Sequence, residues 1–351
     1  MVTTRRIGTA QGRDIHEITL RVASGAEARV LTWGATVSDL VIPTETGPQH
    51  VVVGFANLAD YLADSAHAGA TVGRFANRIA EGRFCLEGQN YQVTRNQDGR
   101  HMLHGGADGE GFSRRPWMLA AQKDNAVTMT LHSPDGEAGF PGAMDVRCTY
   151  RLLPPGTLRI EMQASCDAPT LCNLAHHSYF NLDIPAGYRP GPVPSALDHS
   201  FEVQADFYTP VDADLIPTGE VRQVAGTPFD FRKARKLRNA DGVTFDLGFV
   251  LRQRAQVTNG LIHAATLKGA GTGMQMEVHT TEPHLQLYDG GAYDSVRQGR
   301  DGLEFGPHCG ICLEPQRYPD SPNRSHFSDA VLRAGRVYQQ VTEYRFNALS
   351  H

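Results

Sequence analysis

The chain has 351 residues, of which 40% are hydrophobic and 20% charged, a balance typical of a globular protein with a large core. Its 33 Lys and Arg residues are outnumbered by 38 Asp and Glu residues, so no basic surplus exists to neutralise nucleic-acid phosphates. No apolar run approaches the roughly 18 residues of a membrane helix, and the N-terminal residues lack the apolar core of a secretory signal. We therefore expect a cytoplasmic protein with no membrane and no nucleic-acid partner.

Apolar and polar residues alternate with a period of two along most of the chain, which is typical of strands with one buried face. The clearest segments are 17–22, 127–132, 158–163, 201–205, 274–279 and 337–346. The best helical candidate is a short turn at 57–62. Because these patterns run from end to end without a linker, we predict an all-β chain, a large antiparallel sandwich or barrel, folded as a single domain over residues 1–351.

Three features that resemble cofactor or metal motifs fail in their context. Cys309 and Cys312 form a CxxC pair, but no second pair exists and the motif runs into an apolar strand. His101 and His104 lack a third ligand at a known spacing. The glycine-rich segment 269–273 precedes a strand instead of opening a helix, so a glycine turn is favoured over a phosphate loop. We expect no metal and no cofactor.

Five polar clusters contain charged or histidine side chains among apolar or glycine residues, at 73–79, 101–106, 176–182, 281–288 and 311–320. In the last cluster, Glu314 follows the apolar residues 311–313, and we expect Pro315 to end that strand. Partial desolvation at such a strand end raises the pKa of a carboxyl group toward the range of a general base. The alternative is a structural ion pair between Glu314 and Arg317.

The cluster at 176–182 has a polar and aromatic face if the chain is extended there. His177, Tyr179 and Asn181 would then share one side of the strand, as a sugar-binding surface requires. The alternative is a core histidine whose ring is bonded to backbone carbonyls.

Two further clusters leave their role open. Gly105 and Gly106 remove side-chain bulk beside His104, which lets a ligand approach or simply forms a hairpin turn. Arg78 offers a rigid five-donor fork to hydroxyls or a carboxylate, or serves as a structural arginine in an ion-pair network.

Taken together and in order, several segments resemble the signatures of the aldose 1-epimerase (galactose mutarotase) family. They are GRFANRI at 73–79, LHGG at 103–106, HHSYFNL at 176–182, LEPQRYPDSPN at 313–323 and the long run 208–232. The resemblance spans about residues 5–347. It implies a large antiparallel β-sandwich that interconverts the α and β anomers of a free monosaccharide such as galactose or glucose. We expect it to act without a cofactor, as a monomer or weak dimer.

The resemblance also implies roles for individual residues. Glu314 matches the family's catalytic base and His177 its catalytic acid. The positions that match sugar-binding residues are Asn77, Arg78, His104, Asp246 and Gln286. Two neighbours depart from the family pattern, because His176 replaces a usual asparagine and Leu247 replaces a usual histidine.

Other functions compete with this one. A glycosidase needs a second carboxylate near the first, a part that Asp246 could take beside Glu314. A non-catalytic sugar-binding relative would tolerate loss of Glu314 and His177, and both are present. A mutarotase of another sugar, such as a pentose, is the third alternative.

Overall fold

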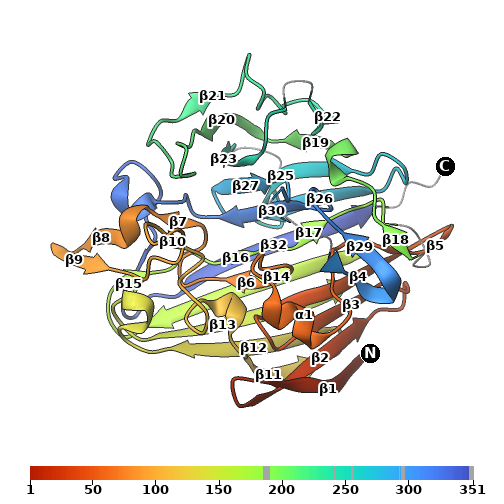
Figure 1. Cartoon of the computed structure of the whole chain (residues 1–351), viewed down its shortest axis with the longest axis horizontal. Coiled ribbons are helices and arrows are strands. Elements are labelled where there is room, and N and C mark those ends of the chain that lie inside the picture. Colours follow the sequence, from red (N-terminus) through yellow and green to blue (C-terminus); the bar gives the residue numbers. More distant parts are fainter. Residues whose placement is uncertain (185–189, 240–241, 254–256, 292, 294–296, 348–351) are drawn as a thin grey trace.

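Residues 1–184, 190–239, 242–253, 257–291, 293 and 297–347 are described by the computed structural model. Strands dominate these residues and form three large sheets and several short ones (Figure 1). Apart from the pair β18–β29, every pairing between these strands is antiparallel. The predicted all-β antiparallel architecture is therefore confirmed.

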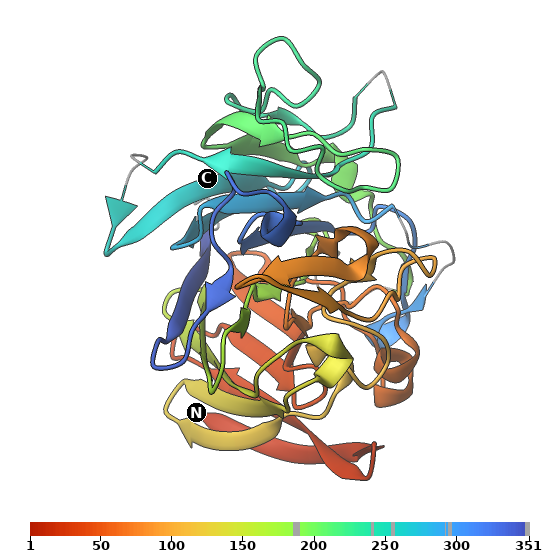
Figure 2. The same ribbon diagram turned by 90° about the vertical axis from the view of Figure 1, so that its left-hand side faces the viewer.

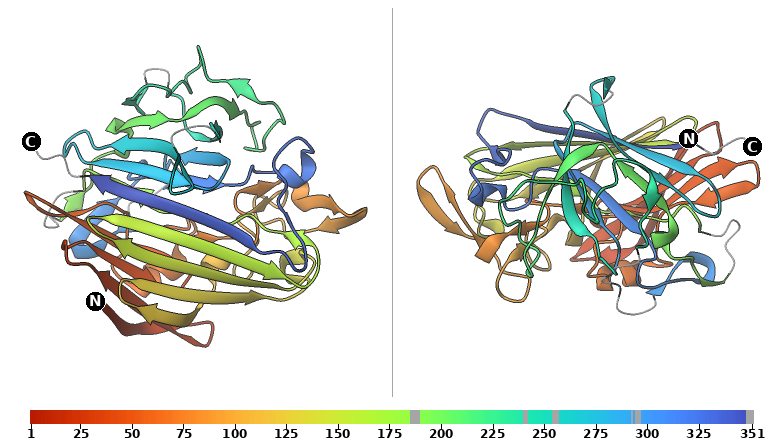
Figure 3. Two further views of the ribbon diagram at one scale, coloured as in Figure 1. Left: turned by 180° about the vertical axis from the view of Figure 1, so that it is seen from behind. Right: turned by 90° about the horizontal axis from the view of Figure 1, so that it is seen from above.

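The largest sheet has ten strands in the order β11-β12-β13-β14-β32-β26-β25-β19-β22, with β24 beside β25. In that order the strands are Met118–Lys123, Ala126–Ser133, Met144–Leu153, Thr157–Cys166, Tyr338–Asn347, Gln275–Thr280, Leu261–Lys268, Ser200–Val203 and Arg235–Lys236, and β24 is Val257–Thr258. The C-terminal strand β32 lies between β14 and β26, so it joins the two halves of the chain into one sheet (Figure 3).

Two other sheets complete the sandwich. The five-stranded sheet follows chain order, with β1 Val2–Ala10, β2 Arg13–Arg21, β3 Glu27–Leu31, β4 Thr36–Thr44 and β5 Gly47–His50. The six-stranded sheet has the order β17 Tyr179–Phe180, β30 Ile311–Gln316, β27 His284–Tyr288, β23 Asp246–Leu251, β20 Ala205–Thr209 and β21 Arg222–Gln223. The N-terminal sheet lies at one end of the molecule and the segment around β20 at the other (Figure 2).

The main hydrophobic core takes side chains from all three large sheets. Strand β13 shows the pattern, since Val146, Cys148 and Tyr150 are buried while Asp145 and Arg147 on the other face are exposed. Each large apolar side chain buried in this way contributes about 1.5–3 kcal/mol. The period-two alternation therefore reflects strands with one face on the core.

Short strands and 3-10 turns lie in the segments that connect the three large sheets. The strands are β6 Thr71–Val72, β7 Arg78–Ile79, β8 Arg83–Leu86, β9 Gln89–Gln92, β10 Met102–Leu103, β15 Thr170–Leu171, β16 Ala175–His176, β18 Gly191–Pro192, β28 Arg297–Gln298, β29 Leu303–Phe305 and β31 Val331–Leu332. Single 3-10 turns occur at Ala80–Gly82, Phe112–Arg114, Glu137–Gly139, Ala196–Asp198, Arg300–Gly302 and Ser321–Asn323. No helix in the described part of the chain is long and apolar enough to cross a bilayer.

The expected helical turn at 57–62 is confirmed as helix α1, Leu58–Ala63, which Asn57 caps by accepting a hydrogen bond from the backbone N–H of Asp60. The strand expected at 201–205 is wrong as a single element. Its residues belong to β19 and β20, which lie in different sheets. The chain crosses between the sheets at Gln204, whose neighbours Val203 and Ala205 are both buried in the core. A corner that buries both flanking side chains preserves the alternation, so the pattern alone cannot reveal it.

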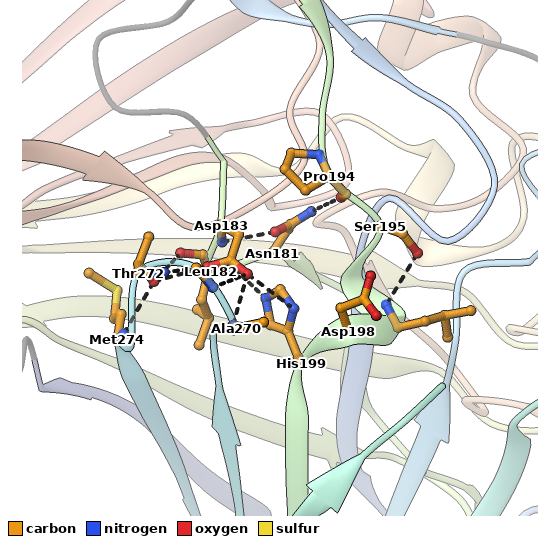
Figure 4. Close-up of polar contacts among 12 residues, drawn as sticks. Asn181, Leu182, Asp183, Pro194, Ser195, Asp198, His199, Ala270, Thr272 and Met274 are labelled. Atoms are coloured by element: carbon orange, nitrogen blue, oxygen red, sulfur yellow. Dashed lines mark hydrogen bonds and ion pairs between the residues drawn. The ribbon is translucent and has the colours of Figure 1, made fainter. Parts of the chain in front are cut away.

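The glycine-rich segment 269–273 is the turn between β25 and β26, as expected (Figure 4). Its backbone N–H groups bind an internal anion, because Ala270 and Thr272 each donate to the carboxylate of Asp183 at 2.9 Å. Burial opposes ionisation of Asp183, but hydrogen bonds from the backbone of Thr272 and Gly271 lower the pKa of this carboxyl group overall. The cluster of N–H groups that suggested a phosphate loop is thus occupied by the protein's own aspartate.

Candidate active site

A cavity of about 430 Å³ brings together six of the seven residues singled out from the sequence. They are Asn77, Arg78, His104, His177, Asp246 and Glu314. The six belong to separate segments around β7, β10, β16, β23 and β30. A larger groove of about 880 Å³ crosses β11–β14, but none of the seven residues lines it. The chemistry therefore converges in the smaller cavity.

Glu314 projects from the middle of β30, which corrects the expectation that Pro315 ends this strand. The ladder to β27 continues past Glu314, with Pro315 opposite Leu285. A proline is accommodated there because β17, on the other side of β30, pairs only with Ile311 and Cys312. The carboxylate is thus fixed by an interior strand of the six-stranded sheet, paired at this position with β27.

The side chain of Glu314 is paired with His177, not with Arg317. Its Oε1 lies 3.6 Å from Nε2 of His177, and both residues are buried. Arg317 instead forms an ion pair with Glu282, at 3.4 Å, so the structural ion-pair alternative for Glu314 is wrong. Burial, and then the charge of Asp246, raises the pKa of Glu314 well above its usual range.

The backbone of His177 is held between β16 and β17. Its N–H donates to Ala70 O and its carbonyl accepts from Gly69 N–H, both at 2.9 Å. The ring itself contacts side chains, with Nε2 facing Glu314 and Nδ1 lying 3.6 Å from Sγ of Cys312. The alternative of a core histidine bonded to backbone carbonyls therefore does not describe this ring.

Burial lowers the pKa of His177 to about 4. The same cause raises the pKa of Glu314, because burial disfavours charge on both groups. Burial therefore favours a carboxylic acid over a carboxylate and a neutral imidazole over an imidazolium. A proton shared by the two groups can reside on either one without changing the charge of the cavity.

His177 and Tyr179 line the cavity, but Asn181 does not, which corrects the expected shared face. The side-chain amide of Asn181 donates to Pro194 O and Cys309 O, each at 2.8 Å. The chain is not one extended strand here, because β16 ends at His176 and β17 begins at Tyr179. Residues two positions apart lie on the same face only within a continuous strand.

A polar group of side chains in the cavity is built around Arg78. Its Nη1 lies 3.3 Å from Oδ2 of Asp246, and its Nε donates to Gln97 at 2.9 Å. Oδ1 of Asp246 accepts from the amide of Gln286 at 2.6 Å. Gln286 is buried and is not among the residues that line the cavity, but it is the direct cross-strand partner of Glu314, so its side chain lies on the same face of the sheet as that carboxylate.

His104 is a neutral donor to the cavity. Its Nδ1 accepts a hydrogen bond from the backbone N–H of Asn77 at 3.2 Å, so the neutral ring carries its proton on Nε2. Burial, reinforced by the neighbouring His67, lowers the pKa of His104 well below its usual value. Gly105 has a φ of +88°, and a Cβ there would meet Gly73 O at 1.9 Å. This glycine allows the chain to turn tightly rather than a ligand to approach.

The cavity contains residues that the sequence analysis missed. His67 lies edge-to-face with His104, 4.8 Å between ring centres, and its Nδ1 is 2.9 Å from Oγ of Ser113. Tyr288 adds aromatic surface near His177, next to Tyr179, which was expected there. His67 stands alone among small residues, so it carries no sequence signal. Tyr288 lies in the fourth polar cluster, next but one to Gln286, and could have been singled out there.

Both departures from the family pattern lie outside the cavity. His176 faces away from it and bonds Oγ of Ser178 at 2.7 Å. Leu247 is buried in the hydrophobic core, because it lies on the opposite face of β23 from Asp246.

An antiparallel β-sandwich that carries a buried acid–base pair in a polar, aromatic cavity is an enzyme architecture suited to small polyhydroxylated substrates. The model of the aldose 1-epimerase family matches residues 16–345. The chain therefore belongs to the aldose 1-epimerase family. This membership defines its activity as an isomerisation, the interconversion of the α and β anomers of an aldose.

Individual relatives agree with this assignment. The galactose mutarotase of Sus scrofa is 37% identical over 323 residues, which cover 91% of this chain and 90% of the relative. The aldose 1-epimerase of Escherichia coli is 34% identical over 350 residues, 96% of each chain. The crystal structure of an aldose epimerase homologue from C. elegans superposes with a TM-score of 0.85 at 29% identity, covering 95% of this chain and 99% of the homologue.

Proposed function

We propose that Glu314 and His177 open and close the sugar ring. Glu314 takes the proton from the C1 hydroxyl while His177 gives a proton to the ring oxygen, so the C1–O5 bond breaks and an open-chain aldehyde forms. Rotation about C1–C2 presents the other face of the aldehyde. Closure returns both protons, which restores the enzyme without a cofactor.

The single observation that carries this proposal is the 3.6 Å approach of Glu314 Oε1 to Nε2 of His177 in the cavity. Oε2 of Glu314 is buried and has no hydrogen-bond partner among the described residues. An unsatisfied buried acceptor is costly, and a sugar hydroxyl at this position would satisfy it. The carboxylate is therefore placed to receive a substrate proton.

We also propose that the remaining predicted residues hold the sugar while C1 rotates. Arg78, Asn77 and His104 supply donors, and the carboxylate of Asp246 accepts from hydroxyl groups. Gln286 is the fifth of these sugar-binding residues, and its amide also orients the carboxylate of Asp246 by a hydrogen bond of 2.6 Å.

We propose a free aldohexose, such as galactose or glucose, as the substrate. The similarity to galactose mutarotases supports a hexose, and a cavity of about 430 Å³ is within the range of small-molecule sites. Polarimetry of freshly dissolved α-anomers of galactose, glucose and a pentose tests both the activity and the preference. A rate no faster than the uncatalysed one for every aldose would refute the proposal.

We further propose that residues 1–351 act as one domain, as a monomer or weak dimer in the cytoplasm. The unbroken family match over residues 16–345 supports one domain. Gel filtration coupled to light scattering measures the oligomeric state, and fractionation of cells measures the location.

A further inference from the structure

A second cluster of possible ligands lies on the ten-stranded sheet. His263 on β25 and Glu277 and His279 on β26 each offer one ligand atom, and these atoms all lie within 4.8 Å of one another. None of the three residues lines the sugar cavity. The cluster is on the face of β26 opposite the core residues Met276 and Val278.

The register of the sheet brings the three side chains together. His263 and His279 are direct partners across β25 and β26, and cross-strand partners have Cβ atoms about 4.5–5.5 Å apart. Glu277 precedes His279 by two residues, so it projects from the same face. The two imidazole rings lie 5.0 Å apart between centres. The arrangement is therefore fixed by backbone pairing and not by flexible loops.

The central histidine of the cluster is buried and contacts the carboxylate. His279 is only 5% exposed, and its Nε2 lies 3.0 Å from Oε2 of Glu277. Its Nδ1 is buried without a hydrogen-bond partner among the described residues. One of the three proposed ligands is therefore held in the sheet and has one ring nitrogen without a partner.

Two arginines near the cluster are paired with carboxylates. Nη1 of Arg345 lies 3.3 Å from Nε2 of His279, but this guanidinium is paired with Glu343 at 2.6 Å. Glu343 also pairs with Arg159, which pairs with Glu161. These pairings partly neutralise the two guanidinium groups, which reduces their repulsion of a cation.

We infer that His263, Glu277 and His279 form a binding site for a divalent transition-metal ion of the zinc class. Two imidazole nitrogens and one carboxylate oxygen are ligands that Zn²⁺ prefers, and a water molecule would complete four-coordination. Zinc bonds of about 2.0–2.2 Å require the ligand atoms to move closer. His263 can move because it is partly exposed and its Nε2 bonds only the hydroxyl of Thr266, at 3.0 Å, within the described residues.

The cavity contains a rival cluster, His177, Cys312 and Glu314, whose possible ligand atoms also lie within 4.8 Å. Here, however, Cys312 faces Nδ1 of His177 and Glu314 faces Nε2. The two nitrogens of one imidazole point in different directions, so a single ion cannot bind the ring between both partners. The outer cluster is therefore the better site.

Isothermal titration of the metal-free full chain with Zn²⁺ tests this inference, together with thermal unfolding at matched zinc concentrations. We expect one zinc ion per chain and a Tm that rises with zinc. The variants His263→Gln and Glu277→Gln should weaken binding at least about tenfold, because loss of even an outer partner of a metal ligand costs 10–100-fold. Both variants should keep wild-type mutarotase activity, because neither residue lines the cavity.

The variant Cys312→Ala is the control for the cavity cluster and should bind zinc as the wild type does. The inference is overturned if the wild type binds no zinc, or if His263→Gln binds it equally well. It is also overturned if binding is lost in Cys312→Ala instead, since the ion would then lie in the cavity. Each of these results is independent of the proposed sugar chemistry.

Discussion

Cys312 and Glu314 lie two residues apart on the same face of β30 and approach the two different ring nitrogens of His177. Sγ of Cys312 is 3.6 Å from Nδ1, and Oε1 of Glu314 is 3.6 Å from Nε2. Burial raises the pKa of Cys312 well above its usual value, so the group remains a thiol. A thiol that donates to Nδ1 favours the tautomer with the proton on Nε2, the nitrogen that faces Glu314.

We therefore expect Cys312 to be a positioning residue. Replacement by Ala should lower kcat about fivefold with little change in KM, since a hydrogen bond contributes about 1 kcal/mol. Replacement by Ser should restore much of this loss, because its hydroxyl can donate to Nδ1. Steady-state kinetics by polarimetry would show both effects. A loss of the same size in both variants would mean that Cys312 contributes only by packing.

Replacement of Glu314 by Gln should lower kcat by about 10²–10⁴-fold, because the amide cannot accept the C1 proton. Gln has nearly the same shape, so the fold should be retained, which circular dichroism can verify. Glu277→Gln, on the outer face of the sheet, is the matched control and should keep full activity. Activity of Glu314→Gln within a few fold of wild type would show that another group is the base.

Replacement of Arg78 by Lys tests how the sugar is held. Lysine keeps the charge, but its single ammonium group cannot contact both Gln97 and Asp246, whereas the planar guanidinium contacts both. We expect KM to rise about tenfold, the effect of losing roughly 1.4 kcal/mol of binding, while kcat changes little. Arg83→Lys, on the exposed hairpin β8–β9, is the control. A loss in kcat alone would place Arg78 at the developing charge of the transition state.

Replacement of His67 by Phe should change which aldoses are preferred. The ring would still pack on His104, but both nitrogens would be lost, and with them the bond to Ser113 and a partner for a sugar hydroxyl. Sites that hydrogen-bond a hydroxyl discriminate strongly between analogues. We expect kcat/KM to fall about tenfold or more for some aldoses of a hexose and pentose series. An equal fall for every aldose would show that His67 does not read a hydroxyl.

The sequence predicted the sheets better than it predicted the geometry of the site. Alternation identifies one face of one strand, so β12, β14, β26 and β32 were foreseen almost to their ends. It cannot show where one strand stops and another begins on a different sheet. For this reason the shared face of His177 and Asn181 was wrong.

Side chains that meet through tertiary contacts carried the least signal. The hydrogen bond from Gln286 to Asp246 carried no sequence signal, because only the pairing of β23 with β27 brings these two side chains together. His67 reaches the cavity because its backbone adopts a φ of +57° in a loop, and no periodicity encodes such a position. The recognised motifs thus located the site, whereas the positions of the loop residues around it followed only from the structure.

The last prediction concerns stability at low pH and rests on His176. This residue is 3% exposed, and burial lowers its pKa to about 3, whereas an unfolded histidine titrates near pH 6.5. Between these values the unfolded chain binds one more proton than the folded chain does. The free energy of unfolding therefore falls as the pH drops from 6.5 toward 3, by about 1.4 kcal/mol per pH unit for this residue.

His67 and His284 act in the same direction, since burial lowers each pKa to about 3. Glu282 has the opposite effect on the free energy of unfolding. Its pKa is raised to about 7 in the folded protein, so it stabilises the fold as the pH falls from 7 toward the lower pKa that a glutamate has in the unfolded chain.

Asn at position 176 keeps a polar side chain beside Ser178 but cannot take up this proton. We expect His176→Asn to be less stable than wild type at pH 7 and to lose less stability on acidification. The difference in free energy of unfolding between wild type and variant should shrink by about 2–3 kcal/mol between pH 6.5 and 4.5, because only the wild type has a histidine here that binds a proton on unfolding. Urea unfolding at a series of pH values measures this change directly. His132→Asn, at an exposed histidine on the outer face of β12, is the control and should follow the wild-type curve. Parallel curves for His176→Asn and wild type would mean that folding does not lower the pKa of His176, in conflict with its buried environment.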